Sequence, residues 1–287
     1  MAPECVFPNI GPYGIEIAKL PRTAVSIFGF DIYWYGVLIV AGIVAGLLAA
    51  VVEAKRTGQD PGIYVDFLFY VLIACFIGLR AYYVAFSWDY YKNDPAKIFA
   101  FRDGGLAIYG AVIAAYITAF VYTKVKKINF GVLGDTAAPG LILGQAIGRW
   151  GNFFNREAFG GYTDSIFAMR YLVSQASHTT DELLANTVAS RGAEYIQVHP
   201  AFLYESIWNL AVFVFLTLFQ RRKKLTGEVC TLYLVCYGFG RFFIEGLRVD
   251  QLMIGNQAVS RLFSVLIVLG GAAVFICRRL INGRKEA

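Results

Sequence analysis

The chain has 287 residues, of which 57% are hydrophobic and only 16% are charged. A soluble protein of this size needs far more charge to cover its surface, so the composition excludes a soluble domain and indicates a polytopic membrane protein. The formal charge of +6 does not indicate nucleic-acid binding, because the basic residues occur in short clusters between apolar segments.

Seven apolar segments are long enough to cross a bilayer, which takes about 17–25 residues. We place them at residues 32–54, 63–86, 105–123, 132–148, 201–220, 228–246 and 260–281. The fourth segment contains Asp135 and Pro139, so neighbouring helices would have to shield it, and six spans are the alternative. The expected fold is an all-α polytopic membrane protein with about seven transmembrane helices, forming a single integral domain over residues 1–287.

Basic clusters follow the first, third, fifth and seventh segments. They are Lys55-Arg56, Lys124/Lys126/Lys127, Arg221-Arg222-Lys223-Lys224 and Arg278/Arg279/Arg284/Lys285. Because basic connections stay in the cytoplasm, the N-terminus is expected outside and the C-terminus inside. Residues 1–31 would then form an external segment, and residues 149–200 an external loop or small head. We expect no cleavable signal peptide, since no basic stretch precedes an apolar one at the N-terminus.

The longest polar interval opens with residues 148–161, Gly-Arg-Trp-Gly-Asn-Phe-Phe-Asn-Arg-Glu-Ala-Phe-Gly-Gly. Its polar side chains include those of Arg149, Asn152, Asn155 and Glu157. Such groups are costly to bury beside an apolar core without partners, and an arginine fork with amide groups suits phosphate oxygens. The glycines on either side of Arg149 favour a turn in which the backbone can approach a ligand. By composition alone, a helix end with a snorkelling arginine and a glycine cap is an equally good interpretation.

A second polar stretch lies at the end of the sixth segment, where Arg241, Glu245 and Arg248 share one helical stripe. Ionisable groups in a membrane span usually face the bundle interior or a polar cavity. A structural ion pair that joins two helices is the alternative. Glu205, inside the fifth segment, must also have a partner, whereas His199-Pro200 before it indicates the start of a helix.

Two tyrosines lie at the starts of other segments. Tyr35 follows Trp34 in the first, and Tyr109 follows Asp103-Gly104-Gly105 in the third. In the expected topology, these and the polar stretches lie near the outer ends of five helices. Snorkelling residues would lie at both ends, so a site that opens to the outer leaflet is the simpler interpretation. The sequence shows no metal-ligand spacing, and we expect neither metal nor cofactor.

Residues 148–161 closely resemble the signature of the bacterial prolipoprotein diacylglyceryl transferases, Gly-Arg-x-Gly-Asn-Phe-x-Asn-x-Glu-x-x-Gly. Similar matches occur at residues 241–248 (Arg-x-x-x-Glu-x-x-Arg), at residues 199–205 (His-Pro-x-x-Leu-Tyr-Glu) and at Tyr35. The chain departs from the family at Tyr109, where many members have histidine. A histidine could serve as general base, but a tyrosine with a pKa near ~10 is mainly a donor. Either Tyr109 orients a substrate or base catalysis lies elsewhere.

The resemblance implies that the chain transfers a diacylglyceryl group from phosphatidylglycerol to the lipobox cysteine of a preprolipoprotein in the bacterial plasma membrane. The implied partners are these two substrates and membrane lipids, without nucleic acid. The candidate catalytic residues are Arg149, Arg241, Tyr109 and Glu245. The candidate substrate-binding residues are Arg149, Asn152, Asn155, Glu157, Tyr35, Arg248 and Glu205.

Three other functions fit the residues less well. A phospholipid transporter or flippase could bind headgroups with the same arginines, but we see neither paired broken helices nor a repeat across two halves. A metal-dependent alcohol phosphatidyltransferase would need several aspartates after Asp103-Gly104, and the sequence does not supply them. A structural scaffold would not need so many buried charges on one face.

Overall fold

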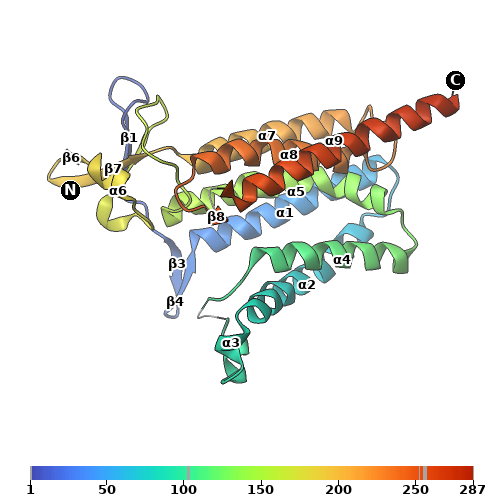
Figure 1. Cartoon of the computed structure of the whole chain (residues 1–287), viewed down its shortest axis with the longest axis horizontal. Coiled ribbons are helices and arrows are strands. Elements are labelled where there is room, and N and C mark those ends of the chain that lie inside the picture. Colours follow the sequence, from blue (N-terminus) through green and yellow to red (C-terminus); the bar gives the residue numbers. More distant parts are fainter. Residues whose placement is uncertain (1, 102–103, 252, 255–256, 287) are drawn as a thin grey trace. The chain divides into compact units, whose positions relative to one another are not determined.

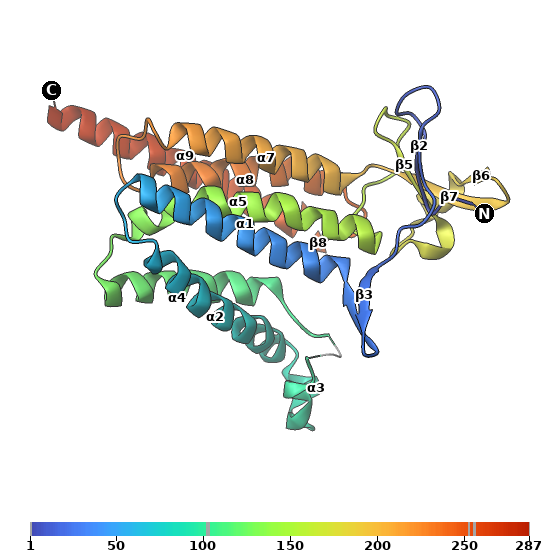
Figure 2. The ribbon, with the colours of Figure 1, turned by 180° about the vertical axis from the view of Figure 1, so that it is seen from behind.

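In the computed structural model, which describes residues 2–101, 104–251, 253–254 and 257–286, all seven predicted segments are helices (Figures 1 and 2). They are α1 (Trp34–Arg56), α2 (Gly62–Phe86), α4 (Ile108–Lys126), α5 (Phe130–Asn155), α7 (Ala201–Phe219), α8 (Glu228–Leu247) and α9 (Val259–Glu286). By length and composition, six of them can cross a membrane, and α8, which carries Glu228, Arg241 and Glu245, is not among the six. The helical, polytopic membrane fold is therefore confirmed.

These helices fall into two compact units, whose boundaries lie inside α1 and α5. The first unit comprises residues 1–46 and 138–287 and contains α7, α8, α9 and every strand described. The second comprises residues 47–137 and contains α2, α4, the short helix α3 (Trp88–Tyr91) and the 3-10 helix η1 (Pro95–Phe99).

The helical core of the first unit forms around α5, whose Ile142 is fully buried among Val212 and Leu216 of α7 and Val229 of α8. This packing provides the shielding that the polar composition of α5 requires, and Pro139 lies within the helix without ending it. Helix α8 also packs against α9.

Helix α1 meets α5 through glycines. Gly42 lies against Gly144, and Gly46 against Gly140, so closely that a Cβ at Gly46 would lie 2.7 Å from the carbonyl oxygen of Gly140. Small residues let membrane helices approach backbone to backbone, and these glycines bring α1 against the helix that carries Arg149.

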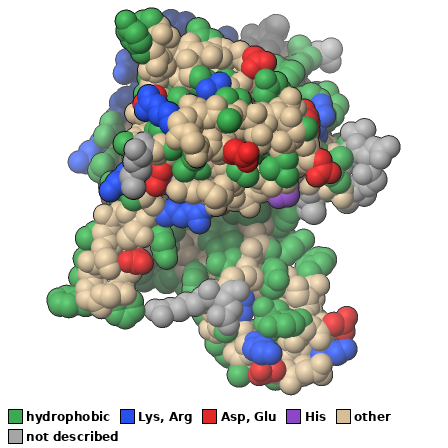
Figure 3. Space-filling model, turned by 90° about the vertical axis from the view of Figure 1, so that its left-hand side faces the viewer, with side chains coloured by type: hydrophobic (Ala, Val, Ile, Leu, Met, Phe, Trp, Pro, Cys, Tyr) green, Lys and Arg blue, Asp and Glu red, His purple; other side chains and the backbone are tan. Residues whose placement is uncertain are grey.

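A five-stranded antiparallel sheet joins the two segments expected to be external. Its order is β2-β1-β5-β7-β6, formed by β1 (Cys5–Phe7), β2 (Ile15–Ile17), β5 (Met169–Leu172), β7 (Ala193–Val198) and β6 (Val188–Ser190). Two separate ribbons pair β3 (Thr23–Ile27) with β4 (Phe30–Tyr33), and β8 (Met253–Ile254) with β9 (Gln257–Ala258). The short helices η3 (Val173–Gln175) and α6 (Asp181–Ala185) complete this region. These strands were not expected from the sequence, which indicated only an external segment and an external loop or small head. Basic, acidic and apolar side chains mix over the upper part of the end that carries the sheet (Figure 3).

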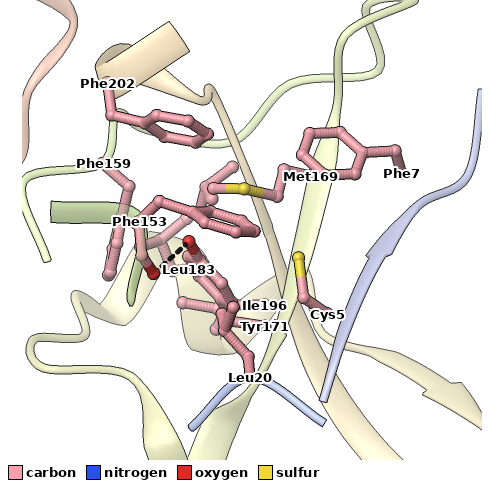
Figure 4. Packing of buried hydrophobic residues seen from close by; sticks show 11 residues of the cluster. Cys5, Phe7, Leu20, Phe153, Phe159, Met169, Tyr171, Leu183, Ile196 and Phe202 are labelled. Atoms are coloured by element: carbon pink, nitrogen blue, oxygen red, sulfur yellow. Dashed lines mark hydrogen bonds between the residues drawn. The ribbon is translucent and has the colours of Figure 1, made fainter. Parts of the chain in front are cut away.

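The apolar core beneath the sheet fixes the helix ends from which the site is built. Phe153, at the end of α5, and Phe202, at the start of α7, pack with Met169 and Tyr171 of β5 and with Cys5 of β1 (Figure 4). The Tyr171 hydroxyl donates a hydrogen bond of 3.1 Å to the backbone carbonyl of Phe153. The end of α5 and the start of α7 are therefore held at the sheet.

In the second unit, α2 packs against α4 at Gly78 and Gly110. Arg80 of α2 is buried and donates hydrogen bonds to five backbone carbonyls of the connection to α4, those of Lys97, Ile98, Ala100, Gly104 and Gly105. Tyr109 is the second residue of α4. Asp103, which belongs to the same sequence stretch, lies outside the described residues, as do the side chains of Arg284 and Lys285.

Candidate active site

Charged side chains from three helices of the first unit meet at the end of the bundle that carries the sheet. Arg149, near the end of α5, lies 2.8 Å from Glu205, near the start of α7. Arg241 of α8 lies 3.4 Å from the other carboxylate oxygen of Glu205 and 2.5 Å from Glu245, one turn further on. Glu245 lies 3.9 Å from Arg248, just beyond α8. We call this series the ion-pair chain; its members are Arg149, Glu205, Arg241, Glu245 and Arg248.

Burial differs between the acidic and basic members of the ion-pair chain. Glu205 and Glu245 are 4% and 3% exposed. The side chains of Arg149 and Arg241 remain 23% and 17% exposed. The acids therefore lie beneath the arginines, and the accessible side at Arg149 and Arg241 is basic. Because one carboxylate holds two guanidinium groups from different helices, both forks are oriented before any ligand arrives.

Arg248 has a second acidic partner, Asp250, which was not among the residues predicted from the sequence. Two hydrogen bonds of 2.9 Å run from Arg248 to the two oxygens of Asp250. Burial alone would raise the pKa of Asp250, but these bonds and the adjacent positive charge hold the pKa below its ordinary value. Asp250 therefore stays ionised and fixes Arg248 at the end of α8. The spacing Arg-x-Asp was the available sequence signal.

The polar residues at the end of α5 form a second group, which we call the amide cluster: Asn152, Asn155 and Glu157. Both asparagine side chains donate hydrogen bonds to the same oxygen of Glu157, at 2.9 and 3.2 Å. Glu157 lies between two non-glycine residues with positive φ, Arg156 at 54° and Ala158 at 56°. Such backbone is strained and tends to occur where function requires it. Here it turns the chain so that Glu157 faces back to α5.

Two members of the amide cluster, Asn155 and Glu157, line a cavity of about 610 Å³. Its walls are formed by Arg22, Tyr33, Tyr35, Gly36, Asn155, Glu157 and Ser177. This lining does not include the ion-pair chain. Arg22 donates hydrogen bonds to the carbonyls of Asn155 and Gln175, at 3.2 and 3.4 Å, and so ties the N-terminal segment to the cavity wall. The sequence offered no signal for Arg22 or Ser177, because their roles arise from tertiary contacts.

Backbone pairing links the amide cluster to the ion-pair chain. The amide of Gly160 donates to the carbonyl of His199, and the amide of Gly161 donates to the carbonyl of Leu247, at 2.9 and 3.0 Å. Gly160 also pairs with Arg248 in an isolated β-bridge. The loop after Glu157 is thus fastened between the start of α7 and the end of α8.

The interpretation of Arg149 as part of a turn is wrong, because α5 continues to Asn155. Phe153, near the helix end, is packed into the sheet core, and this packing outweighs the low helix propensity of the glycines. Gly151 instead allows Tyr35 to pack closely against α5, since a Cβ at this position would lie 2.5 Å from the ring of Tyr35. Tyr35 therefore lies against the helix that carries Arg149.

Two further residues singled out from the sequence have different contacts. The ring of His199 lies 3.2 Å from the Tyr204 hydroxyl, and burial lowers the pKa of His199, which favours its neutral form. This position suits the structural role suggested by His199-Pro200. Tyr109 belongs to the second unit, where its ring centre lies 6.3 Å from that of Tyr82.

Comparison with known proteins gives a family and close relatives. The sequence model of the family described as prolipoprotein diacylglyceryl transferase matches residues 22–277. The chain is 41% identical to the phosphatidylglycerol–prolipoprotein diacylglyceryl transferase of Clostridioides difficile, over 93% of this chain and 100% of the relative. It is 42% identical to the protein of the same name from Listeria monocytogenes, over 93% of both chains. A relative of that name from Bacillus cytotoxicus is 40% identical over 94% of this chain and 96% of its own.

Proposed function

Since the chain belongs to the prolipoprotein diacylglyceryl transferase family, we propose that the ion-pair chain is where it binds the phosphate of its lipid substrate. The reaction is the first step of lipoprotein lipidation, in which phosphatidylglycerol is the lipid and a prolipoprotein is the acceptor. The six apolar helices indicate a membrane enzyme, which would meet its lipid substrate in the bilayer.

In the proposed reaction, the cysteine thiol of the acceptor loses its proton and its sulfur attacks the diacylglyceryl carbon next to the phosphate ester oxygen. The carbon–oxygen bond breaks as the carbon–sulfur bond forms, and its electron pair leaves on the phosphate oxygen. The products are a thioether and glycerol phosphate, whose phosphate group can take up the proton that the thiol lost. Negative charge therefore grows on the phosphate in the transition state, and fixed donors aimed at that charge accelerate such a step.

The observation that carries the proposal is that Arg149 and Arg241 are held on one buried carboxylate, Glu205. Each guanidinium has five N–H donors in a rigid fork, so contact with Glu205 leaves a face of the fork to receive phosphate oxygens. Glu245 sets the orientation of Arg241 from the opposite side. Arg248 extends the binding surface at the end of α8.

The amide cluster and Tyr35 are proposed to orient the polar headgroup. The Glu157 carboxylate can accept hydrogen bonds from glycerol hydroxyls, and its asparagine partners keep it in place. Tyr109 is proposed to help orient a substrate through its hydroxyl group. The basic clusters support a site that opens to the outer leaflet.

An assay with purified protein in phosphatidylglycerol proteoliposomes tests the function. A peptide with a lipobox cysteine should become diacylglyceryl-modified while an equal amount of glycerol phosphate is released. The same peptide with Cys→Ser should give neither product. Movement of labelled lipid between leaflets without peptide modification would contradict the proposal and favour a flippase.

A further inference from the structure

The β3–β4 hairpin carries an apolar face that no described part of the first unit covers. Its cross-strand pairs alternate, with Val25 opposite Ile32 and Ile27 opposite Phe30 on one face. These four side chains are between 40% and 64% exposed. The pair between them, Ser26 opposite Asp31, points to the other face. The hairpin is therefore amphipathic, and its apolar side is open.

The tip of the hairpin has an unfavourable sequence for a turn that is exposed to water. Phe28 is 98% exposed and has a φ of 50°, followed by Gly29 at 81°. Two-residue hairpin turns with positive φ normally use Asn-Gly or Gly-Gly, because a bulky side chain strains this backbone. A phenylalanine here combines backbone strain with exposure of a large ring to water, and an apolar environment would remove the cost of the exposure.

The hairpin projects from the junction between the five-stranded sheet and α1 (Figure 1). The Trp34 amide donates a hydrogen bond of 2.9 Å to the Arg22 carbonyl, which closes the base. Two-stranded ribbons are marginally stable in water unless their apolar face packs against another surface.

The hairpin leads directly into α1, a candidate membrane span. Tyr33, the last residue of β4, directly precedes Trp34, the first residue of α1, a candidate membrane span. Val37, Val40 and Val44 of α1 are exposed apolar side chains of the kind that contact lipid. Tyrosine and tryptophan at such a junction favour the boundary between headgroups and acyl chains.

We propose that the β3–β4 hairpin is a membrane anchor, which inserts Phe28 and its apolar face into the headgroup–acyl boundary of the bilayer. Ser26 and Asp31 then face water, as in other amphipathic elements that lie in the membrane interface. Because Arg22 and Tyr33 flank the hairpin and line the cavity, the anchor holds the cavity mouth at this boundary. The membrane contact does not depend on the proposed reaction.

Fluorine NMR of the full-length protein in nanodiscs tests the anchor. Trifluoromethyl-phenylalanine is incorporated singly at Phe28, Ile27, Ser26 or Tyr13. Tyr13 is the matched control, since it is an aromatic residue that is 93% exposed in the β1–β2 loop of the sheet. Nitroxide-bearing phospholipid should accelerate relaxation several-fold more at Phe28 and Ile27 than at Tyr13. A water-soluble gadolinium chelate should accelerate relaxation more at Tyr13 than at Phe28 and Ile27. At Ser26, its effect should be closer to that at Tyr13.

Two results would overturn the proposal. If the chelate reached Phe28 as readily as Tyr13, the hairpin would lie in water. If neither agent reached Phe28, a protein surface rather than lipid would cover it. Both readouts are independent of catalytic activity, so failure of the transferase assay would leave them unaffected.

Discussion

At the scale of single residues, the candidate site depends on Glu205, whose two carboxylate oxygens each pair with a different arginine. It lies between Arg149 and Arg241, which come from different helices, and it is almost completely buried. Two arginine partners compensate the charge of this buried carboxylate. Each arginine in turn depends on Glu205 for its orientation and for compensation of its own charge.

Replacing Glu205 by glutamine keeps the shape and removes the charge. We expect a clear fall in melting temperature, because breaking a buried ion pair costs about 3–5 kcal/mol. Turnover should fall as well, since both guanidinium groups lose their common support. Glu182→Gln, at an exposed position, is the matched control and should melt like the wild type. If Glu205→Gln melted at the wild-type temperature, the two arginines would not depend on this carboxylate.

Single residues also show how much of the candidate site could be predicted from the sequence. The spacing of Arg241, Glu245 and Arg248 predicted one helical stripe, and the structure places them along one ion-pair chain. That Glu205 needed a partner could be predicted from its place in an apolar segment. Its partners could not, because Arg149 and Arg241 lie 56 residues before it and 36 residues after it in the numbering.

At the scale of elements, the contact between α1 and α5 rests on small residues. Gly46→Ala would place a methyl group 2.7 Å from the carbonyl oxygen of Gly140, and the helices would have to separate. Overpacking of this kind costs about 1–3 kcal/mol, so the melting temperature should fall. Gly270→Ala, in α9, meets nothing within 4 Å and should be neutral or stabilising, since alanine is the better helix former. Equal melting of both variants would mean that α1 and α5 are not so closely packed.

The attachment of the N-terminal segment to the sheet region should depend on pH through Glu4. Burial raises the pKa of Glu4, but hydrogen bonds from the Leu20 amide and Arg156 outweigh it, so the pKa lies below its ordinary value of 4.5. A carboxylate of this kind stabilises the fold above its unfolded pKa, and that stability is lost as pH falls through the folded pKa. The wild-type melting temperature should therefore fall more steeply below pH 4.5 than that of Glu4→Gln. Glu194→Gln, at an exposed position, should keep the wild-type slope. Parallel curves for Glu4→Gln and wild type would contradict the role of Glu4.

The long helices could be predicted because each is a run of apolar residues matched to the thickness of a bilayer. The strands could not, since they are short and their pairing joins distant parts of the chain, such as Cys5 with Tyr171. The end of α5 was misplaced for a related reason. Its glycines suggested a turn, while the packing of Phe153 that extends the helix depends on the same unpredicted sheet.

At the scale of the whole molecule, the orientation in the membrane remains a prediction from the basic clusters. A cysteine at Ser190, exposed in the sheet region, should react with an impermeant thiol reagent added to intact cells. A cysteine at Arg222, also exposed, should react only after the membrane is opened. The parent protein, with its own five cysteines, gives the background. The reverse pattern would place the ion-pair chain at the inner leaflet.

The central claim is that Arg149 and Arg241 clamp the phosphate of the lipid as its charge grows. Its most direct test is the initial rate of glycerol phosphate release against lipid concentration for Arg149→Lys and Arg241→Lys, with folding checked by thermal melting. Lysine keeps the charge but cannot form a two-pronged contact, so each variant should lose on the order of 10²–10³ in turnover. Arg221→Lys, in an exposed basic cluster, should retain wild-type turnover. Near-normal turnover of both site variants would contradict the claim and leave these arginines as structural ion pairs.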